Sequence, residues 1–207
     1  PKSFGEILNS GFEKAWTPTA LSSIENRKYM ILLDEAKTNV ITFSSDADIS
    51  TLSMTPIANL HTSGATFGTM LRSIFQIVDL NAPLNNSTTP LIGIYQLNPF
   101  IHSYYALNAN DNNTAILSDR GTYYVANADN TGYLGVTFST NASAATITAS
   151  SKYEYDTSTS SFTEVTSWTD KYLKINGTSL EWTSTSSDAS SFFLADPNDL
   201  IDLEIEA

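Results

Sequence analysis

The chain of 207 residues carries ten basic and 22 acidic residues, a formal net charge of −12, and no cysteine. The lack of cysteine excludes disulfides, thiolate metal sites and cysteine nucleophiles. The lack of Lys and Arg clusters argues against direct binding to nucleic acid or to an anionic membrane. A hydrophobic content of 41% with only 15% charged residues is typical of a globular β protein whose surface is rich in Ser, Thr and Asn.

The first predicted element is an amphipathic helix from Ser3 to Trp16. Its apolar residues recur at three- and four-residue spacings, and Ser3 and Glu6 stand at the spacing of a capping box. The apolar stripe either packs on the protein's own sheet or docks as an arm on a neighbouring subunit. Its candidate subunit-contact residues are Phe4, Ile7, Leu8, Phe12 and Trp16.

Short β-rich runs follow this helix. Tyr29–Leu33 and Asn39–Phe43 flank a polar turn and predict a hairpin, and Ile49–Met54 predicts a further strand. Thr66–Leu80 has apolar residues at helical spacing and predicts a second short helix. Its run Ile74-Phe75-Gln76-Ile77-Val78 also fits a strand.

A polar, turn-forming stretch at Asn85–Pro90 is the best candidate for a domain boundary. Residues 1–80 hold six basic and eight acidic side chains, whereas residues 81–207 hold four and 14, so the charge balance changes at the same place. We expect an N-terminal part, residues 1–88, with the helix, β-hairpins and the second helix. Residues 89–207 are expected to form an all-β part, and the two parts are able to pack as one domain.

After a predicted strand at Leu91–Leu97, three stretches repeat one pattern: a tyrosine-led strand, a second strand and an aromatic strand. They open at Tyr104, Tyr133 and Tyr172. The third runs from Lys171-Tyr172-Leu173-Lys174-Ile175-Asn176-Gly177 to Phe192-Phe193-Leu194. It resembles the recurring unit of β-trefoil domains of the fascin-like and lectin kind. The resemblance covers residues 171–196 and, more loosely, 104–196, and it implies a β-trefoil-like C-terminal part.

The many short strands separated by turn signals predict the fold class. We expect a mainly β protein built as an antiparallel barrel or sandwich, β-trefoil-like in its C-terminal part, with one or two short helices in the N-terminal part. The last segment, Leu200–Glu206, alternates apolar and acidic residues and predicts a half-buried strand with one acidic face. Its apolar residues are further candidate subunit contacts: Ile201, Leu203 and Ile205.

The sequence offers no recognisable catalytic set. His61 and His102 are the only histidines, and neither stands in a metal-ligand pattern such as H-E-x-x-H. The chain has no G-x-S-x-G nucleophile elbow, and Gly64–Gly68 lacks the Lys-Ser/Thr ending of a phosphate-binding loop. We therefore expect a protein that is not an enzyme and that has no cofactor and no resident metal.

One asparagine-rich stretch has both a functional and a structural interpretation. Asn108, Asn110, Asn112 and Asp119 fall at the offsets of a calcium-binding loop. Such loops need Gly at offset 6, where Asn113 stands, and they carry several carboxylates, where this stretch offers one. A solvated Asn-rich turn is the favoured interpretation.

Three aromatic residues also have two interpretations. Trp168, Tyr172 and Trp182 lie close in the sequence, next to Asp170 and Asn176, in a combination with which many proteins hold sugars. Trp182 stands in the middle of a predicted strand, and large aromatic side chains are usually buried. The core interpretation is favoured, and carbohydrate binding through these three aromatics is the alternative.

A Ser/Thr/Asn-rich β composition without cysteine, secretion signal or catalytic set predicts a protein made inside a cell and displayed outside it in a particle. We expect a non-enzymatic structural or assembly protein, most concretely a virion component such as a phage capsid, decoration or tail protein, synthesised in the host cytoplasm. Its expected partners are other copies of itself or other virion proteins. The alternative is a secreted carbohydrate-binding, β-trefoil-like module with a glycan as partner.

Overall fold

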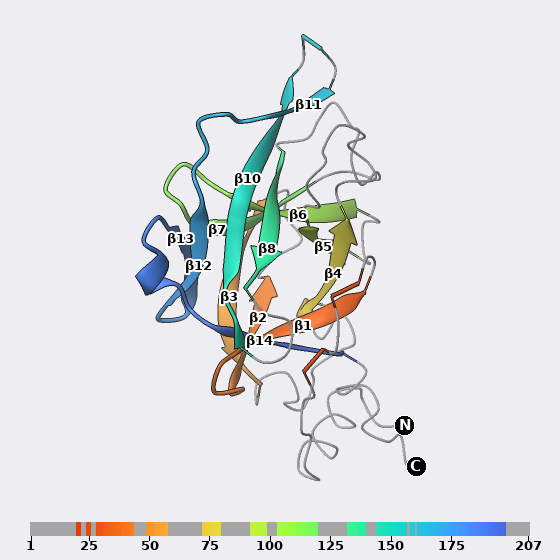
Figure 1. Ribbon diagram of the computed structural model, residues 1–207. Helices are drawn as coiled ribbons and strands as arrows, with labels where there is room; N and C mark the ends of the chain where they lie inside the picture. Colours follow the sequence, from red (N-terminus) through yellow and green to blue (C-terminus); the bar gives the residue numbers. More distant parts are fainter. Residues whose placement is uncertain are drawn as a thin grey trace.

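The computed structural model describes residues 20–21, 24–25, 28–43, 49–57, 72–79, 92–98, 103–119, 132–139, 144–156, 158–159 and 161–197. Within these ranges the chain forms 14 strands and one short 3-10 helix, as Figure 1 shows. Both predicted subunit-contact segments lie outside the described residues: Ser3–Trp16, with Phe4, Ile7, Leu8, Phe12 and Trp16, and Leu200–Glu206, with Ile201, Leu203 and Ile205. The two histidines, His61 and His102, also lie outside them.

The elements follow one another along the chain with short connections. They are β1 (Tyr29–Asp34), β2 (Asn39–Phe43), β3 (Ile49–Pro56), β4 (Ile74–Asp79), β5 (Ile92–Asn98), β6 (Ser103–Ala109), β7 (Ala115–Asp119), β8 (Tyr133–Phe138), β9 (Ala144–Ala145), β10 (Ile147–Asp156), β11 (Ser161–Glu164), β12 (Lys171–Asn176), β13 (Ser179–Thr183), the 3-10 helix η2 (Ser186–Asp188) and β14 (Phe192–Ala195).

Nine strands close into an antiparallel barrel, which confirms the predicted mainly β fold. Around the barrel the order is β1, β2, β3, β13, β12, β10, β8, β5 and β4, and β4 pairs with β1 again. The hairpin β6–β7 bridges two members of this ring, because β6 pairs with β5 and β7 pairs with β3. Strands from both sides of the expected boundary near residue 88 thus share one sheet.

Most predicted N-terminal strands are confirmed, but the second predicted helix is wrong where the structure describes it. Residues 74–79 form β4, which pairs with β1 on one side and β5 on the other. Every side chain from Ile74 to Val78 is buried. An amphipathic helix would leave one face in water, whereas a strand inside a layered sheet buries both faces. The β-branched run therefore outweighed the helical spacing.

Strand β1 is buried on both faces and joins two apolar cores. Met30 and Leu32 belong to the main core inside the barrel. Ile31 and Leu33 belong to a second core, which also contains Phe193 from β14. Because successive side chains of a strand point to opposite faces, one short segment supplies alternate residues to each core.

The β1–β2 turn is fixed by the carboxylate of Asp34. Its Oδ1 accepts hydrogen bonds from the backbone N–H groups of Thr38 (2.8 Å) and Asn39 (3.1 Å), and its Oδ2 accepts one from the Asn39 amide (2.8 Å). Partial burial raises the pKa of Asp34, but the hydrogen bonds from Asn39 and Thr38 outweigh it and hold that pKa below the usual 3.8. Lys37 adopts φ of 61° in this turn, and its Nζ lies 4.2 Å from the Phe193 ring centroid.

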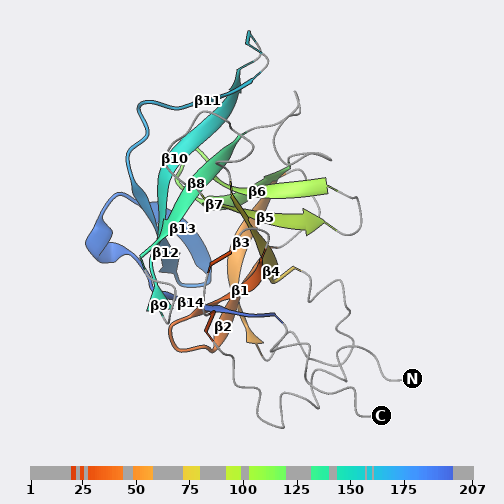
Figure 2. The same ribbon diagram turned by 45° about the vertical axis from the view of Figure 1, so that its right-hand side comes forward.

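Strand β10 and its partner β11 form a projecting hairpin, here called the arm. The first part of β10 pairs with β8 and β12 in the barrel, whereas its last residues, Tyr153 to Asp156, pair with β11. Figures 1 and 2 both show β11 and the outer end of β10 extending beyond the other labelled strands. The arm therefore continues a barrel strand and is not a separate loop.

An aromatic cluster holds the base of the arm. The Tyr133 ring stacks on Tyr153 with centroids 5.1 Å apart, and it meets Phe162 of β11 at 5.3 Å. Burial raises the pKa of Tyr153, and the nearby charge of Glu164 adds to the rise. Aromatic contacts of this kind contribute about 0.5–1.5 kcal/mol each beyond their buried area, so the arm is anchored by side chains as well as by its ladder.

The chain enters β8 through Gly132, where the backbones of β8 and β10 approach closely. Gly132 has φ of +100°, and a Cβ built there would lie 2.1 Å from the carbonyl oxygen of Tyr153. Only glycine fits this approach, because any other residue combines a disfavoured φ with an overlap against backbone.

Candidate functional site

The polar groups of the described residues converge most densely on the turn between β6 and β7, and we describe this region as the candidate site. The side-chain oxygen of Asn110 accepts hydrogen bonds from the backbone N–H groups of Asn112 (3.0 Å) and Thr114 (2.9 Å). Asn113 takes φ of 60° and donates its backbone N–H to the Asn110 carbonyl at 3.0 Å. Asparagine tolerates this left-handed conformation and caps such turns, so the Asn-rich stretch forms the turn that its sequence favours.

Trp182 of β13 binds this turn from the C-terminal part of the chain. Its backbone N–H donates to the carbonyl of Asn113 at 2.7 Å, and its indole Nε1 donates to the carbonyl of Asn108 at 3.3 Å. The Asn108 side chain is itself buried, and its amide donates to Ser118 Oγ at 3.1 Å. Buried polar groups need such partners, since leaving one unsatisfied costs about 1–3 kcal/mol.

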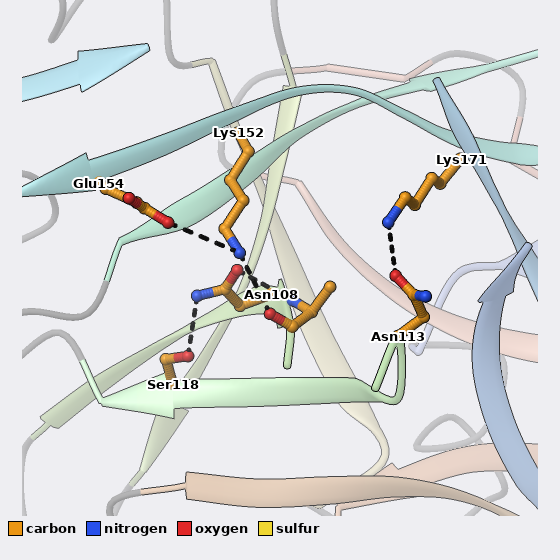
Figure 3. A network of polar contacts seen from close by, with 7 residues as sticks. Asn108, Asn113, Ser118, Lys152, Glu154 and Lys171 are labelled. Atoms are coloured by element: carbon orange, nitrogen blue, oxygen red, sulfur yellow. Dashed lines mark hydrogen bonds and ion pairs between the residues drawn. The ribbon is translucent and has the colours of Figure 1, made fainter. Parts of the chain in front are cut away.

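Two lysines reach the same hairpin from β10 and β12, as Figure 3 shows. Lys152 Nζ donates to the carbonyl of Ala109 at 3.3 Å and lies 3.8 Å from the Glu154 carboxylate. Lys171 Nζ donates directly to the side-chain oxygen of Asn113. The side chain of Lys152 is only 16% exposed, so its ammonium group is held among protein atoms.

Trp168 completes the cluster from the connection between β11 and β12. Its Nε1 donates to the carbonyl of Ala149 at 3.0 Å, which fixes the indole plane against β10. Lys171 Nζ lies 4.5 Å and Lys152 Nζ 5.5 Å from the centroid of its ring. Cation–π contacts contribute about 0.5–2 kcal/mol each, depending on solvent exposure. We call Asn108, Asn113, Lys152, Trp168, Lys171 and Trp182 the turn cluster.

The turn cluster is poorly suited to a cation. The oxygen of Asn110 caps its own turn, that of Asn108 accepts from Ala109 N–H at 2.9 Å, and that of Asn113 accepts from a lysine. The Asp119 side chain lies outside the described residues. Among the residues that the structure describes, no three His, Cys, Asp or Glu side chains stand close enough to hold a metal ion.

The three aromatics proposed for sugar binding do not share a face. Leu173 of β12 stands directly opposite Trp182 of β13, and both side chains are buried. Tyr172 is next to Leu173 in the strand, so it points to the opposite face of this strand pair. Trp182 is 3% exposed, which matches its interpretation as a core residue. Trp168 and Tyr172 are half-buried.

The arm carries the densest described acidic surface. Glu154 and Glu164 are exposed on β10 and β11, and Asp156 stands where the hairpin turns. The side-chain and backbone hydrogen bonds from Ser158, at 2.6 and 2.8 Å, hold the pKa of Asp156 below its usual value. The tip of the arm is therefore a shaped, negatively charged turn.

Sequence reasoning missed the lysines of the turn cluster. Residues 81–207 contain only four basic side chains, and Lys152 and Lys171 are two of them. That scarcity was the available signal, but their meeting at one turn depends on pairings between distant strands. No protein-family model matches the chain, and no curated protein matches its sequence. In the described ranges, no helix has the length and apolar character needed to cross a membrane.

Proposed function

We propose that this protein is a non-enzymatic structural or assembly protein, most concretely a virion component such as a phage capsid, decoration or tail protein, synthesised in the host cytoplasm. Its proposed partners are other copies of itself or other virion proteins. The projecting arm is the single observation that supports this proposal most. A barrel with a stiff β ribbon extending from it presents a shape that suits contact with a neighbouring subunit.

The physical reasoning starts from the edge of β11. Among the described strands β11 pairs only with β10, and a strand edge offers backbone donors and acceptors to another chain. Acidic side chains on the arm, Glu154, Asp156 and Glu164, oppose pairing between two identical arms. The proposed contact is therefore heterologous: the arm of one subunit meets a different surface of the next.

Two terminal segments extend the same proposal. The amphipathic stripe of Ser3–Trp16 and the alternating segment Leu200–Glu206 remain the proposed further subunit contacts, on the strength of their sequence patterns. The β-trefoil-like arrangement of the three repeats is also part of the proposal. Each repeat supplies one antiparallel strand pair, β6–β7, β8–β10 and β12–β13, which supports it.

The test compares two variants with equal changes of charge. Glu154→Lys with Glu164→Lys reverses charge on the arm, and Glu35→Lys with Asp188→Lys reverses it at two exposed turns elsewhere. Particle size is measured by light scattering and electron microscopy, and folding by circular dichroism. We expect the wild type and the turn variant to assemble, and the arm variant to stay folded without assembling.

A different result would favour the alternative. A wild-type protein that is monomeric in its native source and retained on a glycan array would contradict the assembly proposal. Such retention would support a secreted carbohydrate-binding module, with Trp168 and Tyr172 as its half-buried aromatics. Equal assembly of all three proteins would remove the arm from the proposal.

A further inference from the structure

The contact between Lys171 and Asn113 joins two segments that are 58 residues apart. Asn113 is fixed on both sides, since its backbone N–H is bonded to Asn110 and its carbonyl to Trp182. The adjoining Thr114 forms a bridge with Glu181 of β13. Lys171 is the first residue of β12, whose ladder to β13 runs from Tyr172 to Asn176. Both side chains are thus placed by strand pairing.

The surroundings exclude part of the solvent from this contact. Both side chains are half-buried, and the Trp168 indole lies against the amine of Lys171 at 4.5 Å. Because Oδ1 is bonded to Cγ, the amine already lies beside the carbon of the Asn113 amide. Preorganised contact of this kind, with reacting atoms about 3–3.5 Å apart, is what converts an unfavourable encounter into an effectively unimolecular reaction.

We propose that Lys171 and Asn113 form an intramolecular isopeptide bond. Lys171 first loses a proton to solvent, and the lone pair of its neutral Nζ attacks Cγ of Asn113. The Nζ–Cγ bond forms, and the tetrahedral centre collapses as the Cγ–Nδ2 bond breaks. Nδ2 takes up a proton and leaves as ammonia, while Nζ keeps one hydrogen as an ordinary secondary amide. The reaction consumes no oxidant and no other reagent.

This bond would fasten the β6–β7 hairpin to β12 covalently. A cross-link that closes a long loop stabilises mainly by restricting the unfolded chain. The inference goes beyond the proposed function and does not depend on it, since a monomeric protein would form the same bond.

The direct test is the intact mass of the denatured wild-type chain. Loss of ammonia lowers the mass by about 17 Da, and digestion should release a branched peptide that joins Lys171 to Asn113. Samples are measured as purified and after incubation near pH 10, close to the value of ~10.4 at which a lysine amine is half neutral. A wild-type chain with its full sequence mass in both samples would overturn the inference.

Matched lysine variants locate the reacting amine. Lys171→Arg keeps the charge but cannot form the amide, so its chain should keep the full mass. Lys174→Arg alters a lysine of the same strand that pairs with Glu181 at 3.7 Å, and its chain should still show the deficit. The same mass deficit in Lys171→Arg would place the reaction elsewhere and refute the assignment. Asn113→Ala should also keep the full mass.

Discussion

Replacing Gly132 by alanine should destabilise the protein far more than the same change at Gly177. Both glycines have positive φ, +100° and +65°, so each alanine acquires backbone strain of about 1–2 kcal/mol. At Gly177 a Cβ meets nothing within 4 Å. At Gly132 it would lie 2.1 Å from the Tyr153 carbonyl oxygen, and overpacking adds about 1–3 kcal/mol. The expected costs are about 2–5 and about 1–2 kcal/mol.

The overlap at Gly132 cannot be relieved cheaply, because Tyr153 pairs with β8 on one side and with β11 on the other. Moving its carbonyl would disturb both ladders and the base of the arm. Urea unfolding followed by circular dichroism gives the free energy of unfolding of each variant. Equal losses for the two alanine variants, or a larger loss at Gly177, would refute the close-approach reasoning.

Two further predictions concern the β1–β2 turn and the turn cluster. Asp34→Asn should lower the free energy of unfolding at pH 7 by about 1 kcal/mol, a value discounted for solvent exposure. Since the folded pKa of Asp34 lies below 3.8, the wild-type advantage is complete above that value and fades as pH falls through the lowered pKa. Denaturation at several pH values should show this, and an advantage that persists in strong acid would contradict it. Trp182→Phe should cost about 2–3 kcal/mol, through a cavity and the lost donor to a buried carbonyl, whereas Trp168→Phe should cost about 1 kcal/mol; thermal or chemical denaturation compares them, and the opposite ranking would contradict the burial argument.

Local patterns predicted the strands well because a strand's own residues largely decide its faces and ends. The run at Tyr29–Leu33, the turn signal after it and the run at Asn39–Phe43 contain all that a hairpin needs. The segment at Ile74–Val78 shows the limit of this reasoning. Its spacing fits a helix and its β-branched content fits a strand, and pairing with two neighbours decided between them.

The candidate site depends on contacts that no local pattern contains. Trp182 could be assigned to the core from its position in a strand, but its hydrogen bond to Asn108 spans 74 residues. Lys152 and Lys171 look in the sequence like ordinary solvated charges. They meet at one turn only because β10, β12 and β13 are neighbours in the sheet.

The branching of the sheet has a consequence for how the protein opens. Strands β3 and β5 each have three partners, and the β6–β7 hairpin spans between them beside the closed ring. The hairpin could therefore detach as one unit while the nine-stranded ring stays closed, whereas release of β3 or β5 would open both circuits together. In native-state hydrogen exchange, the amides of β3 and β5 should then report global unfolding, and those of the hairpin a separate event of lower free energy.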